Sequence, residues 1–183
     1  MSSNKSILRI TSPSSCDLIG MSICPGKVDA FAYSGPCHRN LDEDLDTIAQ
    51  WGANRVITLL EPEELSYLQV EKLGDEVRKR GMIWHHWPVI DGSALRVRQA
   101  AKSKDPWAKE CELFLEDLDM GKKLFIHCRG GLGRTGSLAA RLLIERGLTP
   151  EAAIAEVRVA RPGAIETLEQ EEYLLKRLWR EGF

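Results

Sequence analysis

Short apolar runs alternate with segments of helical periodicity along most of the chain. The runs with the length and composition of buried strands are 18–24, 56–60, 82–87 and 124–126. The segments with helical character are 41–51, 61–80 with a break near Gly74, the stretch between Asp105 and Gly121, 135–146, 151–160 and 166–179. Strands that alternate with helices predict an α/β fold, in which helices flank a central, mostly parallel sheet.

Residues suited to helix ends support two of these segments. Asn40 precedes the segment 41–51 and is a good N-cap, and Gly52 follows it as a helix-ending glycine. Thr149 is followed by Pro150, the residue type favoured at the first position of a helix. These signals predict where the two helices begin.

Length and composition are those of a globular protein of one domain. The chain has 183 residues, of which 43% are hydrophobic and 28% charged, with a formal net charge of -2. This balance gives no reason to expect nucleic acid or a membrane as a partner, and no apolar run reaches membrane-spanning length. The first residues are polar and rich in serine. We therefore predict a flexible N-terminal arm over 1–15 and a single domain over 16–183.

The cysteine content indicates a reducing compartment. The five cysteines are Cys16, Cys24, Cys37, Cys111 and Cys128. An odd number without a secretory signal argues against a disulfide framework, and no pair has the close spacing of a zinc site. We therefore predict a cytoplasmic protein without a metal or other cofactor. No long apolar surface stripe is left unpaired in the sequence, so we expect a monomer. A regulatory disulfide between Cys111 and Cys128 stays open at this point.

The stretch from His127 to Thr135 contains the main chemical motif and lies between a predicted strand and a predicted helix. Its glycines allow the backbone to curl so that successive N–H groups point inward, and such a nest binds an anion. The positive end of the following helix faces the same point, and Arg134 adds a bidentate grip. The residues predicted to hold a phosphate group are Arg129, Gly130, Gly131, Leu132, Gly133 and Arg134.

The same loop predicts a nucleophile. Cys128 lies at a helix start, where the field stabilises a thiolate that can attack phosphorus and form a phosphocysteine. Asp91 follows a predicted strand end and precedes a glycine, so it is our candidate general acid and then base. Thr135 is placed either to assist breakdown of the intermediate or to cap the helix. The alternatives are a structural cysteine for Cys128, a turn aspartate for Asp91, and Asp105 as a rival acid.

These motifs resemble those of the cysteine-based protein tyrosine phosphatase superfamily, whose signature is His-Cys-x5-Arg-Ser/Thr. The resemblance is closest to the small atypical dual-specificity phosphatases, including those like kinase-associated phosphatase. It implies the phosphatase fold without a metal, with Cys128 as nucleophile, Arg134 as phosphate clamp and Asp91 as general acid. It also implies that Thr135 assists hydrolysis of the phosphocysteine, and that His127 orients the loop and favours the thiolate.

The C-terminal run from Arg161 to Gln170 is similar to the water-positioning loop of that superfamily. Classical tyrosine phosphatases carry glutamine where this chain has Glu166, whereas Gln170 matches their second glutamine. We therefore expect Gln170, rather than Glu166, to orient the hydrolytic water. A phosphotyrosine-recognition loop of the classical type is not evident, which favours a shallow pocket that also accepts phosphoserine and phosphothreonine.

Several functions remain open from the sequence. The leading hypothesis is a dual-specificity protein phosphatase that acts on a phosphorylated protein. The same chemistry would serve a small phosphomonoester, such as a phosphoinositide, an inositol phosphate, a nucleotide or an RNA 5′-phosphate, and Arg129 favours substrates with several phosphates. A phospho-binding module without turnover and a rhodanese-like sulfur carrier are less consistent with the full set of Cys128, Arg134, Asp91 and Thr135.

Overall fold

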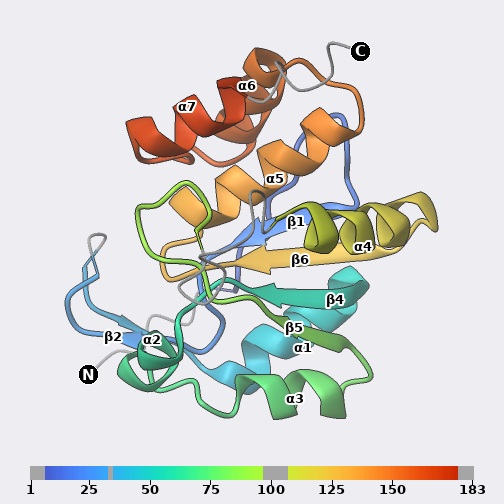
Figure 1. The fold of residues 1–183 in the computed structure, drawn as a ribbon. Coiled ribbons are helices and arrows are strands. Elements are labelled where there is room, and N and C mark those ends of the chain that lie inside the picture. Colours follow the sequence, from blue (N-terminus) through green and yellow to red (C-terminus); the bar gives the residue numbers. More distant parts are fainter. Residues whose placement is uncertain (1–6, 33–34, 97–106, 177–183) are drawn as a thin grey trace.

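A computed structural model of the 183-residue chain describes residues 7–32, 35–96 and 107–176. Figure 1 shows a sheet in the middle of the molecule with helices on both faces. The strands are β1 (Ile19–Ser22), β2 (Val28–Asp29), β3 (Cys37–His38), β4 (Ala53–Thr58), β5 (Ile83–His86) and β6 (Lys123–His127). The helices are α1 (Leu41–Trp51), α2 (Pro62–Tyr67), α3 (Leu73–Lys79), α4 (Trp107–Asp119), α5 (Gly133–Glu145), α6 (Pro150–Ala160) and α7 (Leu168–Lys176).

The main sheet has four parallel strands in the order β1-β6-β4-β5. This confirms the predicted α/β fold with a parallel sheet, and all four predicted strands are present. β2 and β3 form a separate antiparallel pair that the sequence analysis did not predict. Each of them has only two residues, which is too short to produce a recognisable periodic pattern.

Both faces of the sheet are buried, and successive side chains point to opposite faces. On one face Ile57 and Ile126 belong to a core cluster with residues of α4, α5, α6 and α7. On the other face Val56 and Phe125 pack with residues of α1 and α3. Burial on both faces explains why the strands appear in the sequence as continuous apolar runs instead of alternating ones.

The predicted helix ends of α1 and α6 are confirmed. The Asn40 side chain accepts a hydrogen bond from the Glu43 N–H at 3.0 Å, and Gly52 takes a left-handed conformation with φ of 92°. The Thr149 hydroxyl accepts from the Ala152 N–H at 3.2 Å.

None of the helices in the described ranges is both long and apolar enough to cross a membrane.

Two predicted boundaries are wrong. The break in the segment 61–80 lies between α2 and α3, and Gly74 is inside α3. Gly74 is needed there because a Cβ atom would come within 2.4 Å of the Trp84 ring. α5 begins at Gly133, two residues before the predicted start, because the glycine-rich loop already turns into the helix. The last predicted helix is described as far as Lys176.

The N-terminal segment is packed where the structure describes it. Leu8 is only 3% exposed and belongs to the core. The backbones of Thr11 and Met21 exchange two hydrogen bonds, at 3.0 and 2.8 Å. The packed domain therefore begins before residue 16, and residues 7–15 do not form the flexible arm that the sequence predicted.

Candidate active site

The phosphate loop, residues 128–133, leads from the end of β6 into the start of α5. β6 pairs with β1 on one side and β4 on the other, so His127 and Cys128 lie at the carboxyl edge of the sheet. Cys128 is 3% exposed. Arg134 and Thr135 lie in the first turn of α5. The structure thus brings the predicted nucleophile and phosphate clamp to one helix start, where an anion is favoured.

The phosphate loop turns its carbonyl groups toward the surrounding protein. The Arg129 carbonyl accepts from the Lys27 ammonium at 3.3 Å. The Gly130 carbonyl accepts from Arg161 Nη2 at 3.0 Å, and the Gly131 carbonyl accepts from Arg161 Nε. The backbone N–H groups of these three loop residues donate to no other group in the described part of the protein. They are therefore left to bind an anion in the centre of the loop.

Arg134 is held so that one edge of its guanidinium remains free. Nη1 and Nη2 donate to the Glu64 carboxylate at 2.6 and 2.8 Å. Nη1 also donates to the carbonyls of Leu59 and Val89, at 3.2 and 3.1 Å. Nε is buried without a partner among the described residues, and Nη2 lies 3.2 Å from Asp91 Oδ1. Nε and the second N–H of Nη2 form a fork that fits two phosphate oxygens.

The charge of Arg134 is secured by the anions around it. Burial alone would lower the pKa of Arg134, but Glu64, Cys128 and Asp91 together raise it above its ordinary value. Glu64 is the first of these partners, and it is supplied by the acidic turn after β4. The site therefore keeps a permanent cation beside the nucleophile even though the side chain is 1% exposed.

His127 is a neutral part of the site. Burial lowers the pKa of His127 to about 3. Its Nε2 lies 2.8 Å from Thr58 Oγ1, which also accepts a hydrogen bond from Trp84 Nε1 at 2.9 Å. Because the indole can only donate, the Thr58 hydroxyl is free to donate to His127 Nε2. The proton of the imidazole is then on Nδ1, which lies 3.4 Å from the Cys128 carbonyl oxygen.

Three buried side-chain atoms of the site have no partner among the described residues: Arg134 Nε, Thr135 Oγ1 and Gln170 Nε2. A buried polar atom is costly unless something satisfies it, so such atoms indicate where a ligand binds. Thr135 is fully buried, and the N-cap of α5 is Leu132. The capping role considered for Thr135 is therefore wrong. Its hydroxyl has no partner among the described residues and is available for a hydrogen bond within the site.

Asp91 lies on the loop that follows β5, and the structure brings it to Arg134. Its side chain is 68% exposed, and Oδ1 also accepts from the Gly92 N–H at 3.1 Å. Gly92 has φ of 70°, which favours glycine. Asp91 thus lies beside Arg134 at the solvent edge of the site. Asp105, the rival candidate, lies outside the described residues.

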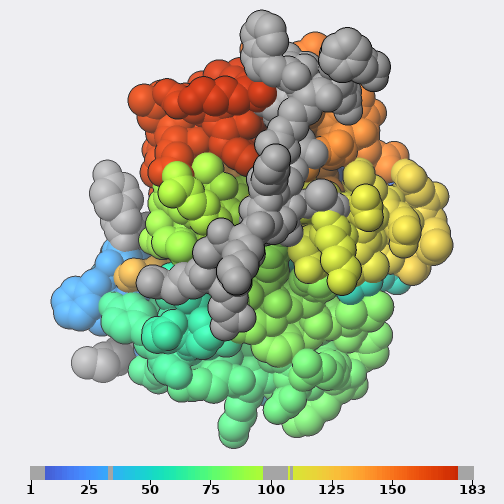
Figure 2. Space-filling model, viewed as in Figure 1, coloured from blue at the N-terminus to red at the C-terminus, as the bar shows by residue number. Residues whose placement is uncertain are grey.

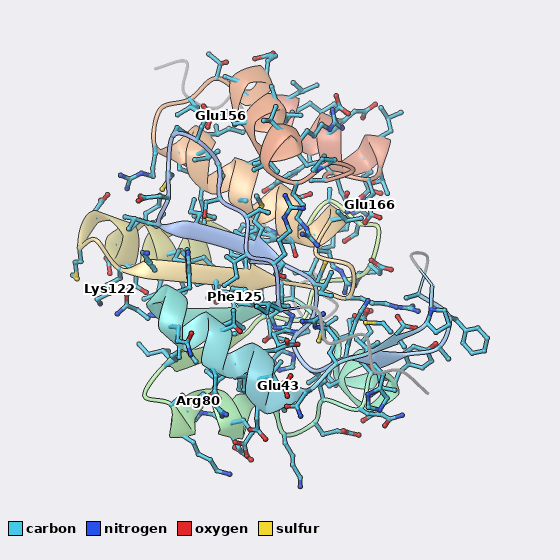
Figure 3. The ribbon with its side chains drawn as sticks, turned by 180° about the vertical axis from the view of Figure 1, so that it is seen from behind. Glu43, Arg80, Lys122, Phe125, Glu156 and Glu166 are labelled. Atoms are coloured by element: carbon cyan, nitrogen blue, oxygen red, sulfur yellow. The ribbon has the colours of Figure 1, made fainter. Side chains whose placement is uncertain are left out.

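Glu166 and Gln170 both lie against the start of α5. Glu166 Oε2 accepts from the Gly133 N–H at 2.8 Å, and Figure 3 labels Glu166 beside this helix. Gln170 Oε1 accepts from the N–H groups of Glu166 and Thr167, at 2.9 and 3.2 Å. Gln170 is 1% exposed, and its Nε2 is left for a ligand or a water molecule. The two side chains therefore have different partners: Glu166 is bound to the phosphate loop, whereas Gln170 keeps a buried N–H group without a partner among the described residues.

The Arg129 side chain points away from the phosphate position. Its guanidinium makes two hydrogen bonds to Asp29, at 2.9 and 3.0 Å, and lies over the Tyr67 ring at 5.1 Å. The bond to Arg129 also lowers the pKa of Asp29, so this pair is charged. Of Arg129, only the backbone is available to a phosphate. The expectation that its side chain serves further phosphates is therefore not supported.

Four further residues shape the site: Lys27, Asp29, Glu64 and Arg161. All of them contact the phosphate loop or its arginines from distant parts of the chain. Glu64 lies in α2 and belongs to the acidic run 61–64, whose position just after a strand end in the sequence favours the rim of the active site. Arg161 begins the C-terminal run that resembles a phosphatase loop. Lys27 and Asp29 carried no local signal.

Comparisons with known sequences identify a family. The model of the family described as Cyclin-dependent kinase inhibitor 3 (CDKN3) matches residues 4–154. Curated proteins of that name from Sus scrofa and Homo sapiens are 34% identical over 139 and 142 residues. Each match covers 74% of this chain but 62% of the relative, so the chain spans less than two thirds of these curated relatives. The protein tyrosine phosphatase type IVA 3 of Bos taurus is 30% identical over 141 residues, which cover 77% of this chain and 73% of the relative.

Solved structures with the same fold include named phosphatases. A kinase associated phosphatase (KAP) whose catalytic site cysteine is replaced by serine matches with a TM-score of 0.80 and 27% identity, over 95% of this chain and 96% of that one. The active form of Tk-PTP matches with a TM-score of 0.65 and 32% identity, over 88% and 92%. The predicted phosphatase fold and the resemblance to this superfamily are thus confirmed.

Proposed function

Because this chain belongs to the cyclin-dependent kinase inhibitor 3 family, within the cysteine-based protein tyrosine phosphatase superfamily, we propose that it hydrolyses phosphomonoesters through a phosphocysteine intermediate. One observation carries this proposal: in the phosphate loop after Cys128, the carbonyls of residues 129–131 are bound to surrounding side chains, and the N–H groups of these three residues have no partner among the described residues. Arg134 adds a buried Nε–H without a partner among the described residues, next to an Nη2 that contacts Asp91 at 3.2 Å. This arrangement suits a tetrahedral dianion better than it suits a purely structural loop.

In the first step the Cys128 thiolate attacks phosphorus. The S–P bond forms as the P–O bond to the leaving group breaks, and Asp91 donates a proton to the departing oxygen. Arg134 and the loop N–H groups hold the three remaining phosphate oxygens, where negative charge is concentrated in the transition state. The position of Asp91, 3.2 Å from Arg134 and exposed to solvent, supports this assignment.

In the second step a water molecule attacks phosphorus and the S–P bond breaks, releasing inorganic phosphate. Asp91, now a carboxylate, accepts a proton from this water. The buried Thr135 hydroxyl donates to the departing thiolate, and Gln170 Nε2 donates to the oxygen of the water. Both atoms lack a partner in the described part of the chain, which supports these roles. Glu166 supports the loop instead, because its carboxylate is bound to the Gly133 N–H.

We propose that the physiological substrate is a phosphorylated protein, with dual specificity for tyrosine and serine or threonine. Three cations at the loop are already engaged: Arg129 by Asp29, and Lys27 and Arg161 by loop carbonyls. A substrate with several phosphates would gain little from them. The names of the relatives, which describe a kinase inhibitor and a kinase associated phosphatase, also favour a protein substrate. The cytoplasmic location and the monomeric state stay predictions.

The experiment is phosphate release from p-nitrophenyl phosphate in EDTA by wild type, Cys128→Ser and Arg134→Lys. Cys37→Ser is a matched control, since Cys37 lies on β3 outside the loop. We expect metal-independent turnover that both site variants abolish and the control retains. Full activity of Cys128→Ser, or an inactive wild type, would contradict the proposal. A panel of phosphotyrosine, phosphoserine and phosphothreonine peptides, run beside phosphoinositides, inositol phosphates and nucleotides, then tests the substrate class.

A further inference from the structure

One short segment, residues 166–170, contacts both loops of the site. Through Glu166 it holds the Gly133 N–H of the phosphate loop. Through Thr167 and Glu169 it holds the acid loop, residues 88–96, which carries Asp91. The mechanism above uses Gln170 of this segment but assigns no part to Thr167 or Glu169.

The contacts to the acid loop surround its tip. The Thr167 hydroxyl donates to the Gly92 carbonyl at 3.0 Å. Glu169 Oε1 accepts from the Ala94 N–H at 3.1 Å and from Arg96 Nη2 at 2.6 Å. In Figure 2 the yellow-green residues of this loop lie directly beneath the red helix α7, as these bonds require. Gly92, the residue next to Asp91, is thus held by a side chain from outside the acid loop.

The acid loop also has internal bonds that make it a compact unit. The Ile90 N–H donates to the Arg96 carbonyl at 2.9 Å, and the Ser93 hydroxyl donates to the Ile90 carbonyl at 2.7 Å. Leu95 is fully buried and anchors the far side of the loop. On the Asp91 side, by contrast, the contacts from outside the loop that the described residues supply are the bond from Thr167 and the contact with Arg134. A small rotation of the tip would therefore move the carboxyl group away from the leaving oxygen.

We infer that Thr167 and Glu169 are positioning residues that hold Asp91 in place for proton transfer. This inference rests on the proposed function, because it matters only if Asp91 is the general acid. Proton transfer requires the donor within hydrogen-bond reach of the leaving oxygen, and a misplacement of about 1 Å costs up to about a hundredfold in rate. Thr167 makes the larger contribution, since the exposed pair of Glu169 and Arg96 is weakened by water and salt.

The dependence of rate on the leaving group distinguishes positioning from a general structural role. A good leaving group such as p-nitrophenolate needs little protonation, whereas phenolate needs a full proton. We expect Thr167→Val to lower kcat/KM about tenfold for phenyl phosphate and less than about threefold for p-nitrophenyl phosphate. Thr167→Ser keeps the hydroxyl and should restore the wild-type ratio. Glu169→Gln should act in the same direction with a smaller effect.

The controls use the same helix and the same acid. Glu172→Gln changes an exposed carboxylate of α7 whose ion-pair partner among the described residues is Lys176, and it should leave both rates unchanged. In an Asp91→Asn background Thr167→Val should cause no further loss, since the group that it positions is gone. Equal losses for both substrates, or an undiminished loss in Asp91→Asn, would overturn the positioning role alone. If the wild type shows no turnover, or if its turnover does not require Cys128, the proposed function and this inference are overturned together.

Discussion

Two hydrogen bonds of 2.6 and 2.8 Å join the Arg134 guanidinium to the Glu64 carboxylate. Arg134 comes from the first turn of α5 and Glu64 from α2, which are 70 residues apart in the sequence. The bonds occupy the end of the guanidinium and leave its side edge free. Glu64 therefore does not block the phosphate position but fixes the plane in which Arg134 receives a phosphate.

Loss of this carboxylate should weaken both catalysis and folding. We expect Glu64→Ala to lower kcat/KM about tenfold, because the guanidinium loses the bidentate partner that sets its orientation. The free energy of unfolding should fall by about 2 kcal/mol, since a buried cation loses hydrogen bonds to a charged group. Assays with p-nitrophenyl phosphate and urea denaturation measure the two effects. Glu63→Ala, an exposed neighbour on α2, is the control, and equal effects in both variants would contradict this role.

The Thr58 hydroxyl links Trp84 to His127, and its loss should leave a buried imidazole and a half-buried indole unpaired. We expect Thr58→Val, which keeps the shape, to lower the free energy of unfolding by about 2–3 kcal/mol. Thr58→Ser keeps the hydroxyl and should recover most of that loss. Urea denaturation of the three proteins gives the comparison. If Thr58→Ser were as unstable as Thr58→Val, packing of the methyl group would be the explanation instead.

Much of the fold was predictable because the pattern reflects burial. β4 and β6 are covered on both faces, so their apolar runs are continuous and visible without a structure. The strand pair of β2 and β3 was not predictable, because two residues show no period. The predicted start of α5 was two residues late, because Gly133 was assigned to the glycine-rich loop although it already belongs to the first turn of the helix.

The candidate site was predictable only where its residues are adjacent in the sequence. Cys128, Arg134 and Thr135 share one loop whose spacing carries the chemistry. Glu64 and Arg161 reach the same loop from α2 and from the end of α6, and only the folded chain shows these contacts. The side chain of Arg129 was misinterpreted for the same reason, since its partner is a buried aspartate 100 residues away.

The buried imidazole of His127 should make folding sensitive to acid. Burial lowers the pKa of His127 to about 3 from 6.5, so the unfolded chain binds a proton that the folded chain does not. Stability is therefore lost as the pH falls below 6.5 toward 3, and the loss between pH 7 and pH 5 is about 2 kcal/mol. Urea denaturation at both values, for wild type and His127→Asn, isolates this contribution. Wild type should lose about 2 kcal/mol more than the variant, and parallel losses would contradict the assignment.

Arg161 should control how well the phosphate loop binds an anion. Its guanidinium holds the carbonyls of Gly130 and Gly131, which keeps the N–H groups of the loop pointing inward. We expect Arg161→Gln to weaken inhibition by vanadate about tenfold, because the carbonyls lose a charged double donor. Arg146→Gln, which removes an exposed ion pair with Asp119, serves as the control and should keep the inhibition constant of the wild type.

Arg161→Lys separates the geometry of this contact from its charge. Burial lowers the pKa of Arg161 while the Cys128 thiolate raises it, so the cation also lies in the field of the nucleophile. If its role is to attract anions, a lysine should preserve vanadate inhibition. If its role is to hold two carbonyls at once, a lysine should fail nearly as badly as glutamine, because an ammonium lacks the planar fork. We expect the second result, since both carbonyls are bound by one guanidinium through two different nitrogens.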